Sequence, residues 1–256
     1  MSEIRGRRDV ALLLAVGLLA GFLSGFFGIG GGTVIVPALV WIGFSQRHAV
    51  ATSLAAIVPT AVAGVVSYVV AGHVAWALGG LLIVGVLAGA RLGSALLSRL
   101  PETVLRWAFV AFLALLAVSQ FTLTPSRDAA AVLDWPHGVA MVGLGLVTGV
   151  LSGLLGIGGG VVIVPGLTFL FGLSDLVARG TSLLVMIPGA ATGTWSNWRK
   201  KLVDLRAAAW IGLPAIAATP LGAWTAHLPS PKVNAVLFGV YLTVLVARSL
   251  YAAAKK

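Results

Sequence analysis

The 256-residue sequence contains no cysteine and few charged side chains. The lack of cysteine excludes a disulfide framework, a thiolate metal site and a cysteine nucleophile or redox relay. Charged residues make up 9% of the chain, whereas hydrophobic residues make up 59%, and the mean hydropathy is +1.05. A soluble domain of this length does not have such a composition. We therefore expect an all-α polytopic protein of the lipid bilayer.

Acidic residues are scarce as well, and all seven lie at the ends of apolar segments or between them: Glu3, Asp9, Glu102, Asp128, Asp134, Asp175 and Asp204. No carboxylate is therefore expected to be buried in the membrane, which argues against a proton-coupled cation transporter or pump. No paired acid and base and no Ser/His set is evident for an intramembrane hydrolase. We expect neither an enzyme nor a bound cofactor or metal ion.

The formal net charge is +10, but the basic residues cluster between apolar segments without interleaved aromatic residues. This pattern indicates membrane topology rather than nucleic-acid binding. Arg5, Arg7 and Arg8 precede the first apolar run, which is too long and followed by too many others to be a cleaved signal peptide. The amino terminus is predicted to be cytoplasmic.

The chain is duplicated. Residues 21–39 read GFLSGFFGIGGGTVIVPAL, and residues 149–167 read GVLSGLLGIGGGVVIVPGL. The match continues beyond the glycines, with Thr52-Ser53 equivalent to Thr181-Ser182 and Pro59 equivalent to Pro188. We predict two homologous repeats, residues 1–121 and 137–256, joined by a linker at 122–136. Each repeat holds four apolar segments, which fall at 10–41, 48–72, 75–98, 104–123, 137–172, 179–198, 205–227 and 232–251.

Four glycines within five residues should break a helix in the first and the fifth segment. Both segments exceed the roughly 20 residues of one span, so each is a tilted, broken span or a re-entrant pair of half-helices. Re-entrant segments place 14 of the 17 basic residues on the cytoplasmic side and full crossings place 11 there. The stronger bias favours the re-entrant arrangement. Three crossings per repeat then predict inverted repeats with both termini cytoplasmic.

At membrane depth the sequence offers neutral donors, which suit an anion. Half-helices that begin after each glycine run would direct unsatisfied N–H groups into a shared site. The outer glycines have the small-xxx-small spacing of close helix packing, and we favour packing for them. For the Thr-Ser pairs, helix capping and ligand contact are equally good interpretations. The candidate substrate-binding residues are Gly30, Gly31, Gly32, Gly158, Gly159, Gly160, Ser24, Ser152, Thr52, Ser53, Thr181, Ser182, Asn197 and Arg91.

Two of these candidates carry a competing interpretation. Arg91 is better explained as a snorkelling residue or one at the cytoplasmic mouth than as a midplane ligand. Asn197 lies at the cytoplasmic end of its segment, at the mouth or in the site. The four histidines lie near segment ends without paired spacing, so we interpret them as interfacial residues: His48, His73, His137 and His227.

The doubled GxGGG-xxxx-P-x-L element, at residues 28–39 and 156–167, resembles that of the sulfite exporter TauE/SafE family of transmembrane permeases. The resemblance covers nearly the whole chain. It implies transport of sulfite, sulfoacetate or other organosulfonates across the bacterial cell (inner) membrane, usually outward. We expect a secondary carrier in which the repeats rock about a central site, with any coupled proton travelling on the substrate. An anion channel and a non-transporting membrane partner of a sulfur-metabolising enzyme are the alternatives. The oligomeric state is not predicted.

Overall fold

The computed structural model describes residues 7–122 and 135–254, so most of the predicted linker at 122–136 and both chain ends lie outside the described residues. Every element in these two ranges is helical, and the helices coincide with the eight expected segments, the first and fifth being divided. In chain order they are α1 (Arg7–Phe27), α2 (Gly32–Ile42), α3 (Gln46–Val70), α4 (Trp76–Leu97), α5 (Glu102–Thr122), α6 (Trp135–Leu155), α7 (Gly160–Pro165), the π-helical turn η1 (Gly166–Leu170), α8 (Asp175–Arg199), α9 (Leu205–Thr225) and α10 (Pro231–Ala254).

Six helices in the described part of the chain are long and apolar enough to cross a bilayer: α1, α3, α4, α6, α8 and α9. Large apolar side chains such as Leu18, Val84 and Leu221 are more than half exposed on their outer faces. Exposed apolar surface on this scale fits lipid rather than water as the surrounding solvent. The prediction of an all-α, multi-pass membrane protein is confirmed.

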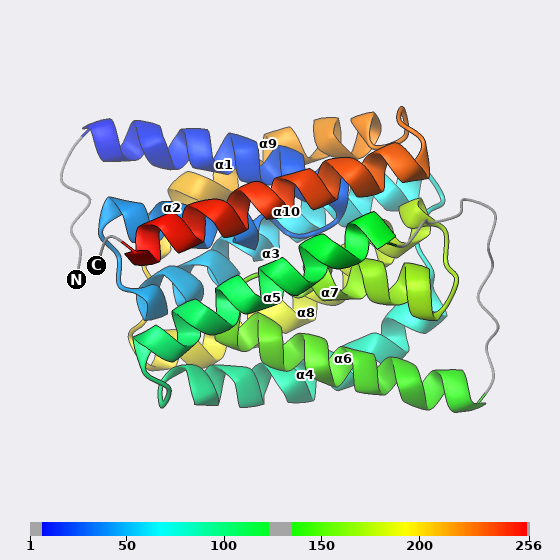
Figure 1. Cartoon of the computed structure of the whole chain (residues 1–256), viewed down its shortest axis with the longest axis horizontal. Coiled ribbons are helices and arrows are strands. Elements are labelled where there is room, and N and C mark those ends of the chain that lie inside the picture. Colours follow the sequence, from blue (N-terminus) through cyan, green and yellow to red (C-terminus); the bar gives the residue numbers. More distant parts are fainter. Residues whose placement is uncertain (1–6, 123–134, 255–256) are drawn as a thin grey trace.

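The two repeats interleave instead of forming separate bodies (Figure 1). Helix α1 packs along α9, and α6, the equivalent of α1, packs along α4, the equivalent of α9. Helices α3 and α8, which are equivalent to one another, pack together, and the equivalent helices α5 and α10 also pack together. Each contact between repeats therefore has a counterpart in which the two repeats exchange roles.

The chain reverses direction at the first break. Figure 1 shows α1 beginning at the left end of the bundle, α2 returning toward that end, and α3 then running to the right. A Cβ atom at Gly31, within the break, would lie 2.8 Å from the carbonyl oxygen of Ala20 on α1. Helix α6 begins at the right end, opposite to the start of α1 (Figure 1).

Small residues allow the helices from different repeats to approach closely. A Cβ atom at Gly25 on α1 would lie 2.7 Å from the backbone nitrogen of Ala223 on α9. At the equivalent crossing, a Cβ at Gly153 on α6 would lie 2.8 Å from the backbone nitrogen of Ser94 on α4. Backbone contacts of this kind are typical of small-residue packing in membranes. The packing interpretation of the outer glycines is confirmed at these positions.

Candidate functional site

Each glycine run forms a sharp turn between a long helix and a short one. Helix α1 ends at Phe27, and Gly31 caps the start of α2 with a φ of 73°. Helix α6 ends at Leu155, and Gly159 caps the start of α7 with a φ of 88°. Positive φ angles of this size are left-handed backbone that residues with a Cβ rarely adopt. The predicted helix breaks are confirmed in both repeats.

The two breaks lie against each other. A Cβ atom at Gly32 would lie 2.6 Å from the Cα atom of Ile157, and a Cβ at Gly160 would lie 2.7 Å from the Cα atom of Ile29. Only glycine fits where two backbones meet at this distance. The structure thus brings together the two glycine runs, which are 128 positions apart in the chain.

Ile57 on α3 and Met186 on α8 pack against both breaks. A Cβ atom at Gly158 would lie 3.1 Å from Cδ1 of Ile57, and one at Gly30 would lie 3.2 Å from Sδ of Met186. Both side chains are fully buried. Sequence reasoning missed them because an aliphatic side chain in an apolar segment carries no distinguishing mark, although they occupy equivalent positions in the two repeats.

The side chains of the two Thr-Ser pairs form hydrogen bonds between the repeats. The hydroxyl of Ser182 donates to the carbonyl oxygen of Gly28 at 2.9 Å, and that of Ser53 donates to the carbonyl oxygen of Gly156 at 2.8 Å. Thr52 accepts a hydrogen bond from the backbone N–H of Asp204 at 3.0 Å, and Thr181 accepts one from that of Ala75 at 2.9 Å. The four hydroxyls therefore hold the breaks and the starts of α9 and α4 in place. Their role as substrate ligands stays a prediction.

The remaining predicted residues divide into buried and exposed ones. Ser24 and Ser152 are buried beside the breaks, and their hydroxyls have no hydrogen-bond partner among the described residues. Asn197 is fully buried near the end of α8, and its side-chain oxygen and nitrogen have no such partner either. Arg91 is exposed on α4, and its role as a snorkelling or mouth residue stays a prediction.

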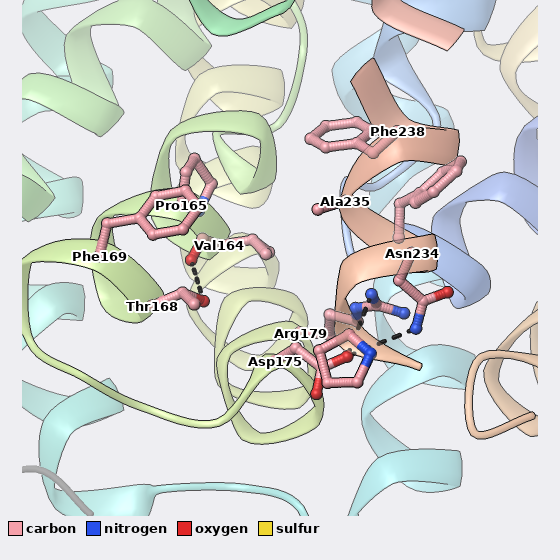
Figure 2. Close-up of a pocket in the computed structure, with 11 residues that line it drawn as sticks. Val164, Pro165, Thr168, Phe169, Asp175, Arg179, Asn234, Ala235 and Phe238 are labelled. Carbon is pink, nitrogen blue, oxygen red and sulfur yellow. Dashed lines mark hydrogen bonds and ion pairs between the residues drawn. The ribbon is translucent and has the colours of Figure 1, made fainter. Parts of the chain in front are cut away.

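A buried ion pair between Arg179 and Asp175 was not expected from the sequence (Figure 2). It lies next to the first break, because a Cβ atom at Gly28 would lie 2.7 Å from the Cα atom of Arg179. Arg179 and Asp175, one turn apart on α8, are 3.4 Å apart between Nη2 and Oδ2, with side chains that are 5% and 4% exposed. Asn234 on α10 donates to the same carboxylate oxygen at 3.4 Å. The three side chains line a cavity of about 20 Å³, which is room for roughly one water molecule.

This cluster adds to what the sequence predicts. Asp175 lies at the start of α8, as expected for a residue at a segment end, and its carboxylate is buried within the protein. Arg179, which the count of basic residues places on the outer side, has a buried guanidinium that points to the end of α1. The signal in the sequence was the Asp-x-x-x-Arg spacing, because residues four apart share one face of a helix.

Arg179 completes the end of α1 at the glycine break. Its Nη1 atom donates to the carbonyl oxygen of Phe26 at 2.6 Å, and its guanidinium carbon lies 5.9 Å from the centre of the Phe26 ring. Carbonyl groups in the last turn of a helix lack partners within that helix, and a cation is favourable there. Val50 occupies the equivalent position in the first repeat, so an apolar side chain stands beside the second break where Arg179 stands beside the first.

Two of the histidines at segment ends also contact each other. Nε2 of His227, after α9, lies 3.4 Å from Nδ1 of His73, in the connection between α3 and α4. Nδ1 of His227 lies 2.9 Å from the carbonyl oxygen of Ala223. The contact joins two connections that are far apart in the chain. Among the described residues, no group of three or more His, Cys, Asp or Glu side chains could hold a metal ion.

A bundle with six helices long and apolar enough to cross a membrane in its described part, and with two glycine-broken segments in contact, is typical of multi-pass membrane transporters. The family model of the sulfite exporter TauE/SafE family matches residues 2–120 and 141–256. The chain belongs to this family, which confirms the resemblance noted in its sequence.

Similar proteins agree with this assignment. A "Probable membrane transporter protein" of Haemophilus influenzae is 31% identical over 219 residues, which cover 81% of this chain and 82% of that protein. The "Probable membrane transporter protein YdhB" of Bacillus subtilis is 31% identical over 189 residues, covering 71% and 76%. "Sulfite exporter TauE/SafE family protein 1" of Arabidopsis thaliana is 45% identical over 49 residues, covering 19% and 11%. No solved structure matches the chain. The prediction that the chain is not an enzyme is confirmed by its family.

Proposed function

We propose that the protein is a secondary carrier that exports small sulfur-containing anions, such as sulfite, sulfoacetate or other organosulfonates, across the bacterial inner membrane. The observation that carries the proposal is the reciprocal contact between the two glycine breaks at the interface of the repeats. Irregular backbone at membrane depth occurs where it is buried in protein or lines a path for a polar solute. A scaffold protein would gain nothing from two such breaks.

The donors near the breaks favour an anion. Ser24 and Ser152 contribute hydroxyls that are free of partners among the described residues. Arg179 supplies a buried positive charge beside the first break, and Asp175, the carboxylate that faces it, is held at 3.4 Å. Neutral donors and one guanidinium are the groups that bind oxyanions without a metal ion.

The mechanism that we propose is alternating access by inverted repeats, with α1–α2 and α6–α7 as re-entrant pairs. The opposite starting ends of α1 and α6 in Figure 1 support inversion. Basic residues support a cytoplasmic location for the end of the bundle where α1 begins. Arg47 donates to the carbonyl oxygen of Leu100 at that end, and Lys200 donates to Ser98. Positive charge gathers on the cytoplasmic side of membrane proteins.

The proposal is tested by measuring uptake and efflux of labelled sulfite, sulfoacetate and thiosulfate in proteoliposomes, with and without an imposed pH gradient. Saturable flux of a sulfur anion that responds to the gradient is expected. Flux that rises without saturation would indicate an anion channel. No flux of any of the three anions, from protein shown to be folded, would overturn the assignment of substrate class.

A further inference from the structure

A group of buried polar side chains lies between α4, α6 and α8, and we call it the α4–α6–α8 polar cluster: Ser94, Thr148, Ser152 and Asn197. Each of these side chains is at most 1% exposed. Their side-chain oxygen and nitrogen atoms have no hydrogen-bond partner among the residues that the structure describes. Buried polar groups are normally paired, so an unpaired group usually marks a ligand, a water or a second conformation.

Contacts between the helices place these side chains together. The Oγ atom of Ser94 lies 3.6 Å from the position that a Cβ would take at Gly193, one turn before Asn197 on the same face of α8. A Cβ at Gly159 would lie 2.5 Å from Cγ2 of Thr148 and 3.6 Å from Cβ of Ser152. The cluster thus extends from the second glycine break toward the end of α8.

The internal duplication provides a comparison, because the equivalent positions, on α9, α1 and α3, are filled differently. The position equivalent to Ser94 holds Ala223, the one equivalent to Thr148 holds Ala20, and the one equivalent to Asn197 holds Tyr68. Only Ser152 has the same residue type at its equivalent position, Ser24. The equivalence is visible in contacts, since Gly25 meets the backbone nitrogen of Ala223 as Gly153 meets that of Ser94. Tyr68 is fully buried, and its hydroxyl donates to the carbonyl oxygen of Gly25 at 2.8 Å. Ser24 and Ser152 are both without a partner among the described residues, so the difference lies at the other three positions, where the Tyr68 hydroxyl is hydrogen-bonded and the shorter Asn197 leaves its polar atoms unpaired.

Basic residues lie at the outer end of the cluster. Nζ of Lys200 donates to the carbonyl oxygen of Ser94 at 2.6 Å and to Oγ of Ser98 at 3.2 Å. Partial burial and then the charge of Arg99 lower the pKa of Lys200. A second cation that disfavours protonation of Lys200 indicates positive potential, which attracts anions.

We infer that the α4–α6–α8 polar cluster is the cytoplasmic vestibule through which a small oxyanion reaches the second glycine break, and that Tyr68 closes the equivalent passage between α9, α1 and α3. This inference rests on the proposed function, since it assigns the path of the transported anion. It makes the two halves of the carrier unequal, with one polar route and one sealed route around a common centre.

The test uses the natural absence of cysteine. Ser94→Cys and its matched control Ala223→Cys are reconstituted, and modification by the anionic sulfonatoethyl methanethiosulfonate and by its trimethylammonium analogue is timed by mass spectrometry. The vestibule predicts that Ser94→Cys reacts about tenfold faster than Ala223→Cys with the anionic reagent, because reaction follows access to the thiolate. The preference should reverse or vanish for the cationic reagent, and sulfoacetate should slow the reaction.

A second variant closes the proposed passage. Asn197→Tyr introduces the residue that fills the first repeat, so it should slow the modification of Ser94→Cys and the flux of sulfoacetate. Equal, slow modification of Ser94→Cys and Ala223→Cys would overturn the vestibule even if Asn197→Tyr failed to fold. If the unmodified protein transports the anion but Ser94→Cys does not react, the vestibule is refuted and the proposed function is not. If Ser94→Cys reacts selectively with the anionic reagent but the protein transports none of the anions, the proposed function is refuted and the accessibility of the cluster to anions is not.

Discussion

Arg179 is the residue that makes the two glycine breaks chemically different. It donates to the carbonyl oxygen of Phe26 and pairs with Asp175, whereas Val50 stands at the equivalent position in the first repeat. An ion pair inside a bundle is sustained only by close geometry and additional hydrogen bonds, and removal of one partner leaves an uncompensated charge. Arg179 and Asp175 therefore have to be considered as one unit.

Replacing Arg179 alone should be far more damaging than replacing the pair. Arg179→Val removes the opposite charge from the buried Asp175 carboxylate, and it should lower the free energy of unfolding by about 3 to 5 kcal/mol. The double variant Asp175→Gln, Arg179→Val installs the residues of the first repeat and should recover a large part of that loss. Thermal unfolding in detergent measures both. Equal loss in the single and double variants would show that the ion pair is not the source of the effect.

The serine hydroxyls that span the repeats should contribute to stability in matching amounts. Ser53→Ala and Ser182→Ala each remove a donor from a buried carbonyl oxygen, so each should lower the free energy of unfolding by about 1 to 3 kcal/mol. Ser98 is exposed, so its hydrogen bonds to Ala95 and Lys200 are at the surface, and Ser98→Ala serves as the control. We expect the control to change stability by less than about 0.5 kcal/mol. If Ser98→Ala is destabilised as much as the two buried variants, the hydrogen bonds of Ser53 and Ser182 contribute no more to stability than a surface hydrogen bond.

At the level of elements, the short helices α2 and α7 exist because glycine allows the chain to reverse within a few residues. Gly31 and Gly159 adopt left-handed backbone, and each lies close to the long helix that precedes it. The glycine run, the helix break and the Thr-Ser pairs could all be predicted, because they depend on local backbone chemistry and on internal repetition. The burial of Asp175 and Arg179 could not, because it depends on how α10 and the end of α1 pack around the start of α8.

The difference between glycines at the breaks and glycines elsewhere can be measured. In Gly159→Ala the left-handed backbone alone costs about 1 to 2 kcal/mol, and the added methyl group would lie 2.5 Å from Cγ2 of Thr148. A Cβ added at Gly143 on α6 would have nothing within 4 Å, so Gly143→Ala should be neutral or slightly stabilising. The two variants are compared by anion flux in proteoliposomes and by thermal unfolding in detergent. Full transport by Gly159→Ala would argue against the break as part of the site.

At the level of the whole molecule, the interleaving of the repeats follows from small residues and equivalent helix pairs. Helix number and the positions of the breaks were predictable from hydropathy and repetition, whereas the partners of each helix were not, since apolar segments of similar composition can pack in many orders. The pairing of α1 with α9 and of α4 with α6 has to be read from the structure. The matched glycines Gly25 and Gly153 show that the same packing rule operates in both pairs.

The re-entrant arrangement predicts which side of the membrane each connection occupies. Ser45, between α2 and α3, and Ser230, before α10, are both exposed. With re-entrant pairs, Ser45→Cys should react with an impermeant thiol reagent only in inverted vesicles, and Ser230→Cys only in intact cells. The cysteine-free chain requires no background substitutions. Labelling of Ser45→Cys from outside the cell would show that α1–α2 crosses the membrane completely.

Counterflow tests the central claim of a carrier with a shared site most directly. Proteoliposomes loaded with unlabelled sulfoacetate are diluted into a trace of the labelled anion without any ion gradient. Alternating access predicts transient accumulation of label inside, because the loaded site returns faster when it carries substrate. Entry of label that is independent of the internal anion would contradict alternating access, and it would identify the path through the two glycine breaks as a channel.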